Sequence, residues 1–563
     1  MRFSTVVSTL AIAGGIADAT LHSGRSLKHV GKKDKHIRKT RDTASRREQQ
    51  HEKRDASFPY LTNSTAKFSV NGSAIPDVDF DVGESYAGLM PISKDANETR
   101  QLYFWFYPST NELASDEILI WLNGGPGCSS LEGLIQENGP WTWQYGTYAP
   151  VQNPWTWTNL TNVVWVEQPV GTGFSQGKPT ATSEEDVAAQ FLGFWENFVD
   201  TFALQGRKVF ITGESYAGYY VPYIADAMFN KNDTSTYYNV EGTMIYDPST
   251  SYDIIQEQIP AVQFVDYWGG LFPFNDSFVE QIHNVSDSCG YTDYLSKYLT
   301  YPPPGPFPSS LPGTGDDGLT TTDECDVFDL IYEEVFNVNP CWDIYQVATT
   351  CPQLWDVLGF PGSNSYLPAG AQIYFNRTDV QKAINAPIQE WEECSNTDVF
   401  INGTDNSLPS GLSILPSVIE RSKRTIIGHG ALDMVLIANG TLLMIQNMTW
   451  GGMQGFQSKP SSPFYVPYHD ELSASTLAAS GVLGTTHTER KLTFVYVDLS
   501  GHMVPQYAPS AAYRTLEYLL GRIESLSSTV PFSTQGEVGQ SAAPLGNGTG
   551  PPIKREVLGG MRF

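Results

Sequence analysis

Residues 213–218 read Gly-Glu-Ser-Tyr-Ala-Gly, directly after an apolar run and directly before an amphipathic stretch at 219–229. The pattern predicts that Ser215 lies on a sharp turn between a strand and a helix. Such a turn needs a small residue two positions before the serine and another two positions after it, because the two backbones nearly touch there. Gly213 and Ala217 meet this requirement, so the stretch favours Ser215 as a nucleophile. A glycine-flanked turn without chemistry is the alternative interpretation of the same six residues.

Strand-like and helix-like runs alternate on both sides of this turn. Strands are expected at 102–107, 118–122, 162–167, 208–212, 425–427 and 492–497. A helix is expected at 183–204, opened by a capping box of Ser183 and Asp186. This order predicts an α/β fold, in which helices flank a mixed, mostly parallel central sheet.

Length and composition favour one large catalytic domain with an insertion. The 563 residues are 40% hydrophobic and 12% aromatic, which is enough to bury a large core. Residues 246–410 lose the regular alternation and contain five of the six cysteines. We expect this segment to be a disulfide-stapled cap, inserted between a first core part at 55–245 and a second at 411–530.

The two ends of the chain differ from the core in charge and composition. An apolar run that ends in a small-x-small pattern predicts a signal peptide at 1–19, and the dibasic pair at 53–54 predicts a propeptide at 20–54. A merely solvated basic tail is the alternative for the second segment. Residues 531–563 are rich in Gly, Ser and Pro and are expected to be a flexible tail. The chain is therefore predicted to be secreted, with a vacuolar destination as the alternative.

Charge and hydropathy exclude two classes of partner. The first 54 residues carry 13 Lys and Arg against 5 Asp and Glu, whereas the whole chain has a net charge of −27. So acidic a remainder repels phosphate backbones, and we expect no nucleic-acid partner. No later stretch approaches the roughly 20 apolar residues that span a bilayer, so no stable membrane insertion is expected.

Cysteines and glycosylation motifs agree with passage through a secretory pathway. Six cysteines form an even set and favour three disulfides, and the absence of a metal-binding spacing predicts no metal and no cofactor. Asn-x-Ser/Thr motifs, which mark a glycoprotein, stand at Asn63, Asn71, Asn97, Asn159, Asn232, Asn275, Asn284, Asn376, Asn402, Asn439, Asn447 and Asn547.

A nucleophilic serine needs a base, and the base needs a group that orients it. Asp433 and His502 each follow a predicted strand of the second core part. The order Ser215, Asp433, His502 is the order found in α/β-hydrolases. His429, four residues before Asp433, is the best rival for the role of base.

Four separate blocks resemble the serine carboxypeptidase family of α/β-hydrolases, of the secreted or vacuolar fungal kind. They are residues 121–130, 137–140, 167–175 and 213–218, and the resemblance runs from about 60 to 525. It implies a serine exopeptidase that releases C-terminal amino acids from peptides and proteins through an acyl-enzyme intermediate.

The resemblance also implies roles for single residues. Ser215, Asp433 and His502 would form the catalytic triad. The oxyanion hole would consist of the backbone N–H groups of Gly125 and Tyr216. The family's binders of the substrate's terminal carboxylate match Asn123, Glu137 and Glu214, with Trp121 and Gly124 beside them. Cys128 and Cys394 would form the bridge between core and cap.

The chemistry of the implied carboxylate site predicts a preference for acidic pH. Two glutamates can hold a third carboxylate only by sharing protons with it, which needs raised pKa values. Two other functions stay open at this point. An acyltransferase on the same fold would keep the triad and pass the acyl group to an alcohol, and a binding protein would keep the scaffold without catalysis. The oligomeric state is left open.

Overall fold

The computed structural model describes residues 58–359, 367, 370–469 and 480–535. The chain divides into residues Met1–Pro59 and a second unit, Tyr60–Phe563, which contains the sheet and the candidate site. The predicted signal peptide, the predicted propeptide and most of the predicted tail lie outside the described residues. No helix within the described part is long and apolar enough to cross a membrane.

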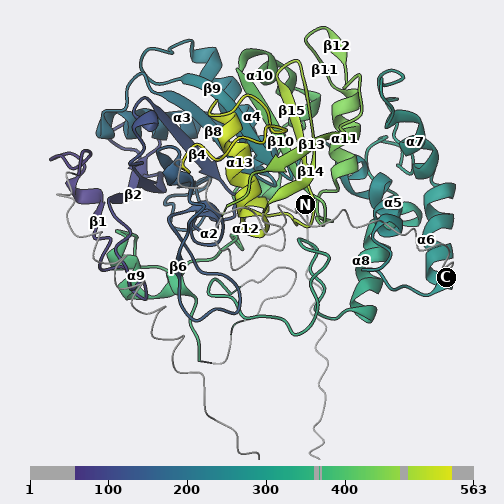
Figure 1. Ribbon diagram of the computed structural model, residues 1–563, viewed down its shortest axis with the longest axis horizontal. Helices are drawn as coiled ribbons and strands as arrows, with labels where there is room; N and C mark the ends of the chain where they lie inside the picture. Colours follow the sequence, from purple (N-terminus) through teal and green to yellow (C-terminus); the bar gives the residue numbers. More distant parts are fainter. Residues whose placement is uncertain (1–57, 360–366, 368–369, 470–479, 536–563) are drawn as a thin grey trace, which may run out of the picture. The chain divides into compact units, whose positions relative to one another are not determined.

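Eleven strands of the described chain form one mixed sheet (Figure 1). Their bounds are β1 (Ser69–Val70), β2 (Ser85–Pro91), β3 (Gln101–Tyr107), β4 (Glu117–Leu122), β7 (Val163–Glu167), β8 (Lys208–Glu214), β9 (Asn239–Tyr246), β10 (Arg424–Gly430), β13 (Ser462–Val466), β14 (Gly481–Glu489) and β15 (Leu492–Val497). The order across the sheet is β1-β2-β3-β7-β4-β8-β9-β10-β15-β14-β13. The six strands from β7 to β15 are parallel, and the strands outside them are antiparallel. The predicted α/β fold with a mixed sheet is confirmed.

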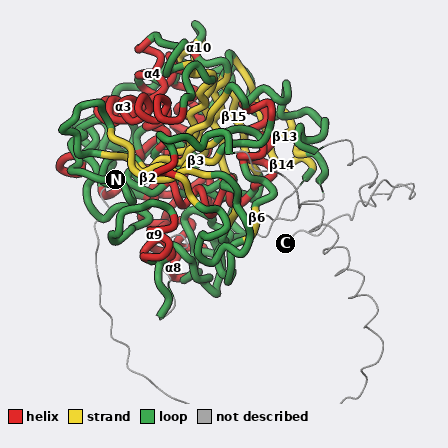
Figure 2. Tube along the Cα trace, turned by 90° about the vertical axis from the view of Figure 1, so that its left-hand side faces the viewer, coloured by secondary structure: helices red, strands yellow, loops and turns green. Residues whose placement is uncertain are grey.

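Helices cover both faces of the sheet because the side chains of each strand alternate between two apolar cores. The helices α3 (Glu184–Phe202) and α4 (Ala217–Lys231) share one core with residues such as Phe104 and Ile120. They lie together in both views (Figures 1 and 2). The helix α13 (Pro509–Leu519) shares the opposite core with Trp105 and Trp121.

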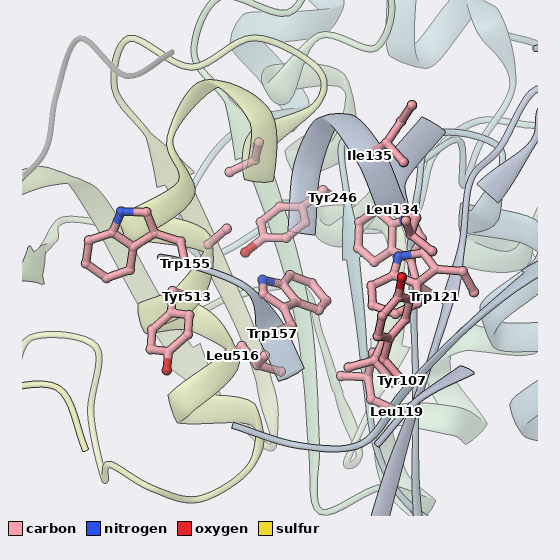
Figure 3. Close-up of a cluster of buried hydrophobic side chains, with 14 of the residues drawn as sticks. Tyr107, Leu119, Trp121, Leu134, Ile135, Trp155, Trp157, Tyr246, Tyr513 and Leu516 are labelled. Atoms are coloured by element: carbon pink, nitrogen blue, oxygen red, sulfur yellow. The ribbon is translucent and has the colours of Figure 1, made fainter. Parts of the chain in front are cut away.

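The core on the α13 side of the sheet contains a cluster of large aromatic side chains. Trp121 of β4 meets the edge of Trp157, with ring centroids 5.1 Å apart. Figure 3 shows both side chains in one buried cluster with Tyr246, the last residue of β9. This packing fixes the end of β4, from which several candidate site residues follow.

The capping box predicted for the helix at 183–204 is wrong. Ser183 stands at the N-cap of α3, but its side chain caps nothing. The Asp186 carboxylate instead accepts from the backbone N–H and the hydroxyl of Thr182, at 2.9 and 2.7 Å. The hydroxyl of Ser407 accepts from the Glu184 N–H at 2.6 Å. A residue more than 200 positions away thus accepts the hydrogen bond of the first backbone N–H of the helix, and no local sequence motif could reveal this contact.

The segment between β9 and β10 contains most of the remaining helices. They are the π-helical η5 (Ile254–Gln258), α5 (Ile259–Tyr267), α6 (Asp276–Ser288), α7 (Tyr291–Tyr298), α8 (Val327–Val338), α9 (Thr378–Ala383) and α10 (Leu415–Arg421). After β10 comes α11 (Ala438–Asn447), and its residues share a third core with α5 to α8 and with Ile427 and Phe494 of the sheet. The helices α5 to α8 and α11 are thus packed onto the sheet.

All six cysteines are paired, so the predicted set of three disulfides is present. The pairs are Cys128–Cys394, Cys289–Cys325 and Cys341–Cys351. Shorter elements are the hairpins β5 (Trp141–Thr142) with β6 (Val151–Gln152) and β11 (Thr449–Trp450) with β12 (Met453–Gln454), the helix α12 (Val504–Tyr507), and the 3-10 turns η1 (Ala66–Phe68), η2 (Glu112–Ala114), η4 (Trp157–Asn159), η6 (Asp323–Cys325), η7 (Tyr374–Asn376), η8 (Ile401–Gly403) and η9 (Ser410–Leu412).

Candidate active site

The candidate residues follow neighbouring parallel strands at one edge of the sheet. Asn123 follows β4, Ser215 follows β8 and Asp247 follows β9. Asp433 lies three residues after the end of β10, and His502 five residues after the end of β15. Because the carboxyl ends of parallel strands meet at the same edge, residues scattered over 380 positions of the chain come together.

Ser215 occupies the sharp turn between β8 and α4. Its φ of +61° is a left-handed conformation, which is unusual for a residue other than glycine. A Cβ on Gly213 would lie 2.2 Å from the Leu122 carbonyl oxygen and 2.7 Å from the Ala217 Cβ. The turn therefore needs a glycine before the serine and has room for only a small residue after it, as the sequence pattern predicts.

His502 and Asp433 form a buried pair. The Nδ1 of His502 lies 2.9 Å from Asp433 Oδ2, and the Val435 N–H donates to Asp433 Oδ1 at 2.8 Å. The backbone carbonyl of the cap residue Tyr345 accepts from the backbone N–H of His502 at 2.8 Å, and the ring centroids of the two side chains lie 5.2 Å apart. The other imidazole nitrogen, Nε2, is buried and has no hydrogen-bond partner among the described residues. With Nδ1–H held by Asp433, Nε2 is left as a proton acceptor.

The loop after β4 approaches the serine turn through backbone alone. A Cβ on Gly124 would lie 2.4 Å from the Tyr216 backbone nitrogen and 2.7 Å from the Ser215 Cβ. Gly125 has a φ of +111°, which L side chains rarely adopt. Within the described residues, neither the Gly125 N–H nor the Tyr216 N–H donates a hydrogen bond. Both donors are therefore available to an oxygen that develops negative charge next to the serine.

Three buried glutamates surround one amide beside this turn. The indole N–H of Trp121 donates to Asn123 Oδ1 at 2.8 Å, which fixes the amide so that its nitrogen faces the acids. This nitrogen lies 2.5 Å from Glu132 Oε2, 3.2 Å from Glu137 Oε1 and 2.9 Å from Glu214 Oε1. The second carboxyl oxygens of Glu137 and Glu214 are buried and have no partner within the described chain.

The three acids must retain protons because they are buried together without a cation. None of the described ion pairs includes Glu132, Glu137 or Glu214. Burial raises the pKa of each well above its ordinary value. The charge of Glu214 raises the pKa of Glu137 further, and the charge of Glu132 raises the pKa of Glu214 further. The site therefore offers carboxylic acid protons as donors.

Glu132 is the site residue that the sequence reasoning missed. It ends the short helix α2 (Ser130–Glu132), which continues into the π-helical turn η3 (Gly133–Asn138). Residues five apart do not share a face of an α-helix, whereas i→i+5 hydrogen bonding brings Glu132 and Glu137 to one side. The one hint in the sequence is the glycine at position 133. The structure shows why it is needed, because a Cβ there would lie 2.2 Å from the Trp121 indole nitrogen.

The bridge between Cys128 and Cys394 lies directly behind this loop. It joins the turn after β4 to a segment 266 residues later, at the end of the cap. The next residue, Ser129, donates its N–H to the Glu393 carbonyl at 2.7 Å. The pairing that the resemblance implied is present, and it ties the candidate oxyanion loop to the cap.

His429, the rival base, does not join the His502 pair directly. Its Nε2 lies 2.8 Å from Thr441 Oγ1 and its Nδ1 lies 3.0 Å from Asp247 Oδ1. Burial, with a smaller effect of His502, lowers the pKa of His429 to about 3. A fully buried, neutral imidazole whose two nitrogens both face protein atoms is poorly suited to take a proton from Ser215.

Comparison with known proteins agrees with the resemblance in the sequence. The family model described as serine carboxypeptidase matches residues 76–522. A probable serine carboxypeptidase of Arthroderma benhamiae is 60% identical over 93% of this chain and 99% of its own length. The serine-type carboxypeptidase F of Aspergillus niger is 46% identical over 83% of this chain and 89% of its own. In fold, the crystal structure of a prohormone-processing carboxypeptidase from Saccharomyces cerevisiae matches with a TM-score of 0.62 at 22% identity, over 83% of this chain and 99% of that one.

Proposed function

Because this chain belongs to the serine carboxypeptidase family, we propose that Ser215, His502 and Asp433 form the triad with which it removes C-terminal amino acids from peptides. The Ser215 hydroxyl attacks the last peptide carbonyl while His502 Nε2 takes its proton. Asp433 keeps the proton of His502 on Nδ1 and stabilises the imidazolium. The N–H groups of Gly125 and Tyr216 bind the oxyanion.

The reaction then proceeds through an acyl-enzyme. The imidazolium of His502 gives its proton to the departing amino group, and the peptide stays bonded to Ser215 as an ester. Water takes the place of the released amino acid, His502 removes its proton, and the attack on the ester regenerates the serine. One amino acid is released in each cycle.

The observation that supports an exopeptidase best is the position of the acid cluster. Glu214 precedes Ser215 in the chain, and its carboxyl lies on the Asn123 amide together with Glu137. A terminal carboxylate held there leaves room for one substrate residue between the acid cluster and Ser215. Only the last peptide bond of the substrate therefore reaches the serine. We assign Asn123, Glu137 and Glu214 to this carboxylate, with Trp121 and Gly124 as the adjoining wall.

The same cluster supports a preference for acidic pH. The acids have raised pKa values because they are buried beside one another. While they hold protons, they donate hydrogen bonds to a substrate carboxylate; once they ionise, they repel it. Binding of free-acid peptides is therefore favoured at acidic pH.

A product analysis with one active-site variant tests this function. The enzyme should release single amino acids from the C-terminus of a free-acid peptide, as measured by mass spectrometry of the products over time. Ser215→Ala should lower kcat by at least about 10⁴-fold, because nucleophile and base act as one unit. Its melting temperature should stay within about 2 °C of the wild type. Turnover within about tenfold of wild type would refute the triad, and release from the N-terminus or from internal bonds would refute the exopeptidase.

We further propose that the chain enters the secretory pathway and is secreted or delivered to a vacuole. The support is the sequence of residues 1–54, the twelve glycosylation motifs and the pairing of all six cysteines. Cleavage after Arg54 should release the active enzyme. N-terminal sequencing of the secreted protein checks this, and a fully active protein that begins at residue 20 would remove the propeptide.

A further inference from the structure

A second buried aspartate lies beside the proposed triad and has no part in the mechanism above. Asp247 directly follows β9, and its side chain is fully buried. Its φ of +42° is left-handed, which is strained for any residue except glycine and, to a lesser degree, Asn or Asp. Its N–H donates to the Gly428 carbonyl and its Oδ1 accepts from the Gly430 N–H, both at 2.8 Å. The fold thus holds this carboxyl firmly at the functional edge of the sheet.

Asp247 lies against the carboxylate that orients His502. One oxygen or nitrogen from each of Asp247, Asp433 and His502 lies within 4.8 Å of the other two. All three residues are buried. Asp247 Oδ2 accepts a hydrogen bond from no donor among the described residues. The two aspartates are therefore close neighbours, and Asp433 stands between its imidazole partner and a second acid.

The neighbours of His429 fix how the other side of Asp247 is held. The side-chain Oε1 of Gln256 accepts from the backbone N–H groups of Thr250 and Ser251, which fixes the orientation of the side-chain amide. The Gln256 amide nitrogen then donates to Thr441 Oγ1 at 3.0 Å. Thr441 keeps its own hydroxyl proton for His429 Nε2, at 2.8 Å.

The tautomer of His429 follows from this arrangement. With Nε2 accepting from Thr441, the imidazole proton is on Nδ1, which lies 3.0 Å from Asp247 Oδ1 in a bent contact. The Gly430 N–H donates to Oδ1 of Asp247, and Nδ1 of His429 lies beside the same oxygen. The second oxygen, Oδ2, is left for the remaining neighbour, Asp433.

Two buried carboxyl groups this close cannot both be ionised, so one proton must stay with the pair. Asp433 receives the stronger donors: His502 Nδ1 at 2.9 Å, the Val435 N–H at 2.8 Å and the Leu436 N–H at 3.4 Å. These donors stabilise the charged form of Asp433. The proton consequently belongs to Asp247.

We propose that Asp247 is a positioning residue of the catalytic site: its neutral carboxyl donates a hydrogen bond to Asp433 and so holds that carboxylate in line with His502. The inference rests on the proposed triad, because Asp247 acts only through Asp433. It assigns His429 the role of holding Asp247, which explains why a histidine that cannot serve as base is buried here.

The electrostatics of the site agree with this assignment. Burial first, and then the charge of Asp433, raises the pKa of Asp247 well above its ordinary value, while the Gly430 N–H lowers it. Glu214 is the other nearby charge, and it acts in the same direction as Asp433. His429 is neutral and supplies no compensating charge.

Two substitutions of Asp247 separate a neutral donor from a charge. Asp247→Asn keeps the shape, the tolerance of left-handed φ and an N–H donor, but it has no titratable proton. We expect its kcat to stay within about threefold of wild type. Asp247→Leu has a similar size without a donor, and we expect its kcat to fall between about tenfold and a hundredfold with KM within about threefold, as for other groups that orient a reacting residue.

The matched control lies on β9, the strand that ends directly before Asp247. Thr243→Val removes a fully buried hydroxyl, which donates to Thr425 Oγ1 at 3.2 Å, from the sheet four residues before Asp247. Thr243→Val should lose stability because one buried hydrogen bond is missing, and its kcat should not change. Comparing the melting temperature and kcat of the three variants distinguishes a positioning effect from loss of stability.

Infrared spectroscopy of the whole enzyme keeps the proposal falsifiable if Asp247→Leu fails to fold. The carbonyl band of one protonated carboxylic acid should disappear in Asp247→Asn and persist in Thr243→Val. The proposal is overturned if Asp247→Asn loses as much kcat as Asp247→Leu, if Asp247→Leu keeps full kcat, or if no acid band is lost. Failure of the triad itself shows separately, as turnover by Ser215→Ala.

Discussion

At the scale of single residues, the proposed carboxylate site depends on acids that remain protonated. Arginine would bind a substrate carboxylate at any physiological pH, because its guanidinium stays charged. In the proposed site, Glu137 and Glu214 do so only while they hold a proton. Burial raises both pKa values; the charge of Glu214 raises that of Glu137 further, and the charge of Glu132 raises that of Glu214 further. Under this proposal, affinity for peptides depends on pH through the same side chains that we assign to the substrate's C-terminus.

The first consequence is a pH dependence of KM that is specific for free-acid peptides. As the pH rises through the raised pKa values, the acids ionise and repel the third carboxylate, so KM should increase by about tenfold or more between pH 5 and pH 8. In the double variant Glu137→Gln with Glu214→Gln, the amides stay neutral and the rise should flatten. KM is measured against pH for wild type and variant on one blocked dipeptide.

The C-terminal amide of that dipeptide is the control substrate, because it carries no third charge. Its hydrolysis should persist at higher pH, because ionised glutamates do not repel an uncharged C-terminus. Identical pH profiles of KM for acid and amide in the wild type would contradict proton sharing and leave the triad untouched.

At the scale of elements, a single π-helical turn assembles the acid cluster. The turn η3 brings Glu137 to the same amide as Glu132, and Gly133 between them lies against Trp121 and Asn123. The proposed recognition of the substrate carboxylate thus depends on backbone geometry as much as on the identity of the acids.

Adding one methyl group at Gly133 tests this role of the turn. A Cβ there would lie 2.2 Å from the Trp121 indole nitrogen and 2.7 Å from Asn123 Oδ1, so it must displace the bond that orients the amide. Gly133→Ala should lower stability by about 1–3 kcal/mol and lower kcat/KM for free-acid peptides by at least about tenfold. Gly270→Ala, where a Cβ meets nothing within 4 Å, is the matched control and should leave both unchanged. Equal effects of the two substitutions would show that the packing at η3 is irrelevant.

The sequence predicted the elements whose pattern is local. The strands β3, β4, β7, β8, β10 and β15 and the serine turn were found because apolar runs and small residues mark them directly. β9 was not predicted, although it lies beside β8 at the centre of the sheet. Since Asp247 is defined by the end of that strand, its place beside Asp433 was missed as well.

The candidate site shows the same division between local and distant causes. Asn123, Glu137 and Glu214 were proposed from motifs, and the structure brings their side chains together. Glu132 was missed because the α-helical period separates it from Glu137. The start of α3 was predicted wrongly because Ser407 satisfies it from a distant segment. The catalytic roles themselves stay predictions until variants are measured.

At the scale of the whole molecule, acidic side chains lie in the buried core as well as on the surface. The net charge is −27. Beyond the site described above, Glu184 is fully buried, both of its carboxyl oxygens lack a partner within the described residues, and burial and Asp405 raise its pKa well above the ordinary value. Such groups bind protons more tightly in the folded chain than in the unfolded chain.

The last prediction is that the protein loses stability as the pH rises. A carboxyl whose folded pKa is raised contributes its full stability below the unfolded pKa of about 4.3, and loses it as the pH rises through the folded value. Each such group can therefore destabilise the fold by up to about 1.4 kcal/mol per pH unit across its window. The urea midpoint should be higher at pH 5 than at pH 8.

Two variants test this prediction: one removes a carboxyl whose pKa is raised, and the other removes a carboxyl whose pKa is lowered. Glu184→Gln cannot ionise and should narrow the difference between the midpoints at pH 5 and pH 8. Glu98, whose pKa is lowered to about 2 by its hydrogen bond with Arg100, is ionised at both values. Its contribution is complete above pH 5, so Glu98→Gln should lower both midpoints equally and keep the difference. If the wild-type midpoint were higher at pH 8, or if Glu184→Gln left the difference unchanged, buried acids would not control the stability of this protein, and surface charge repulsion would have to explain any dependence that remains.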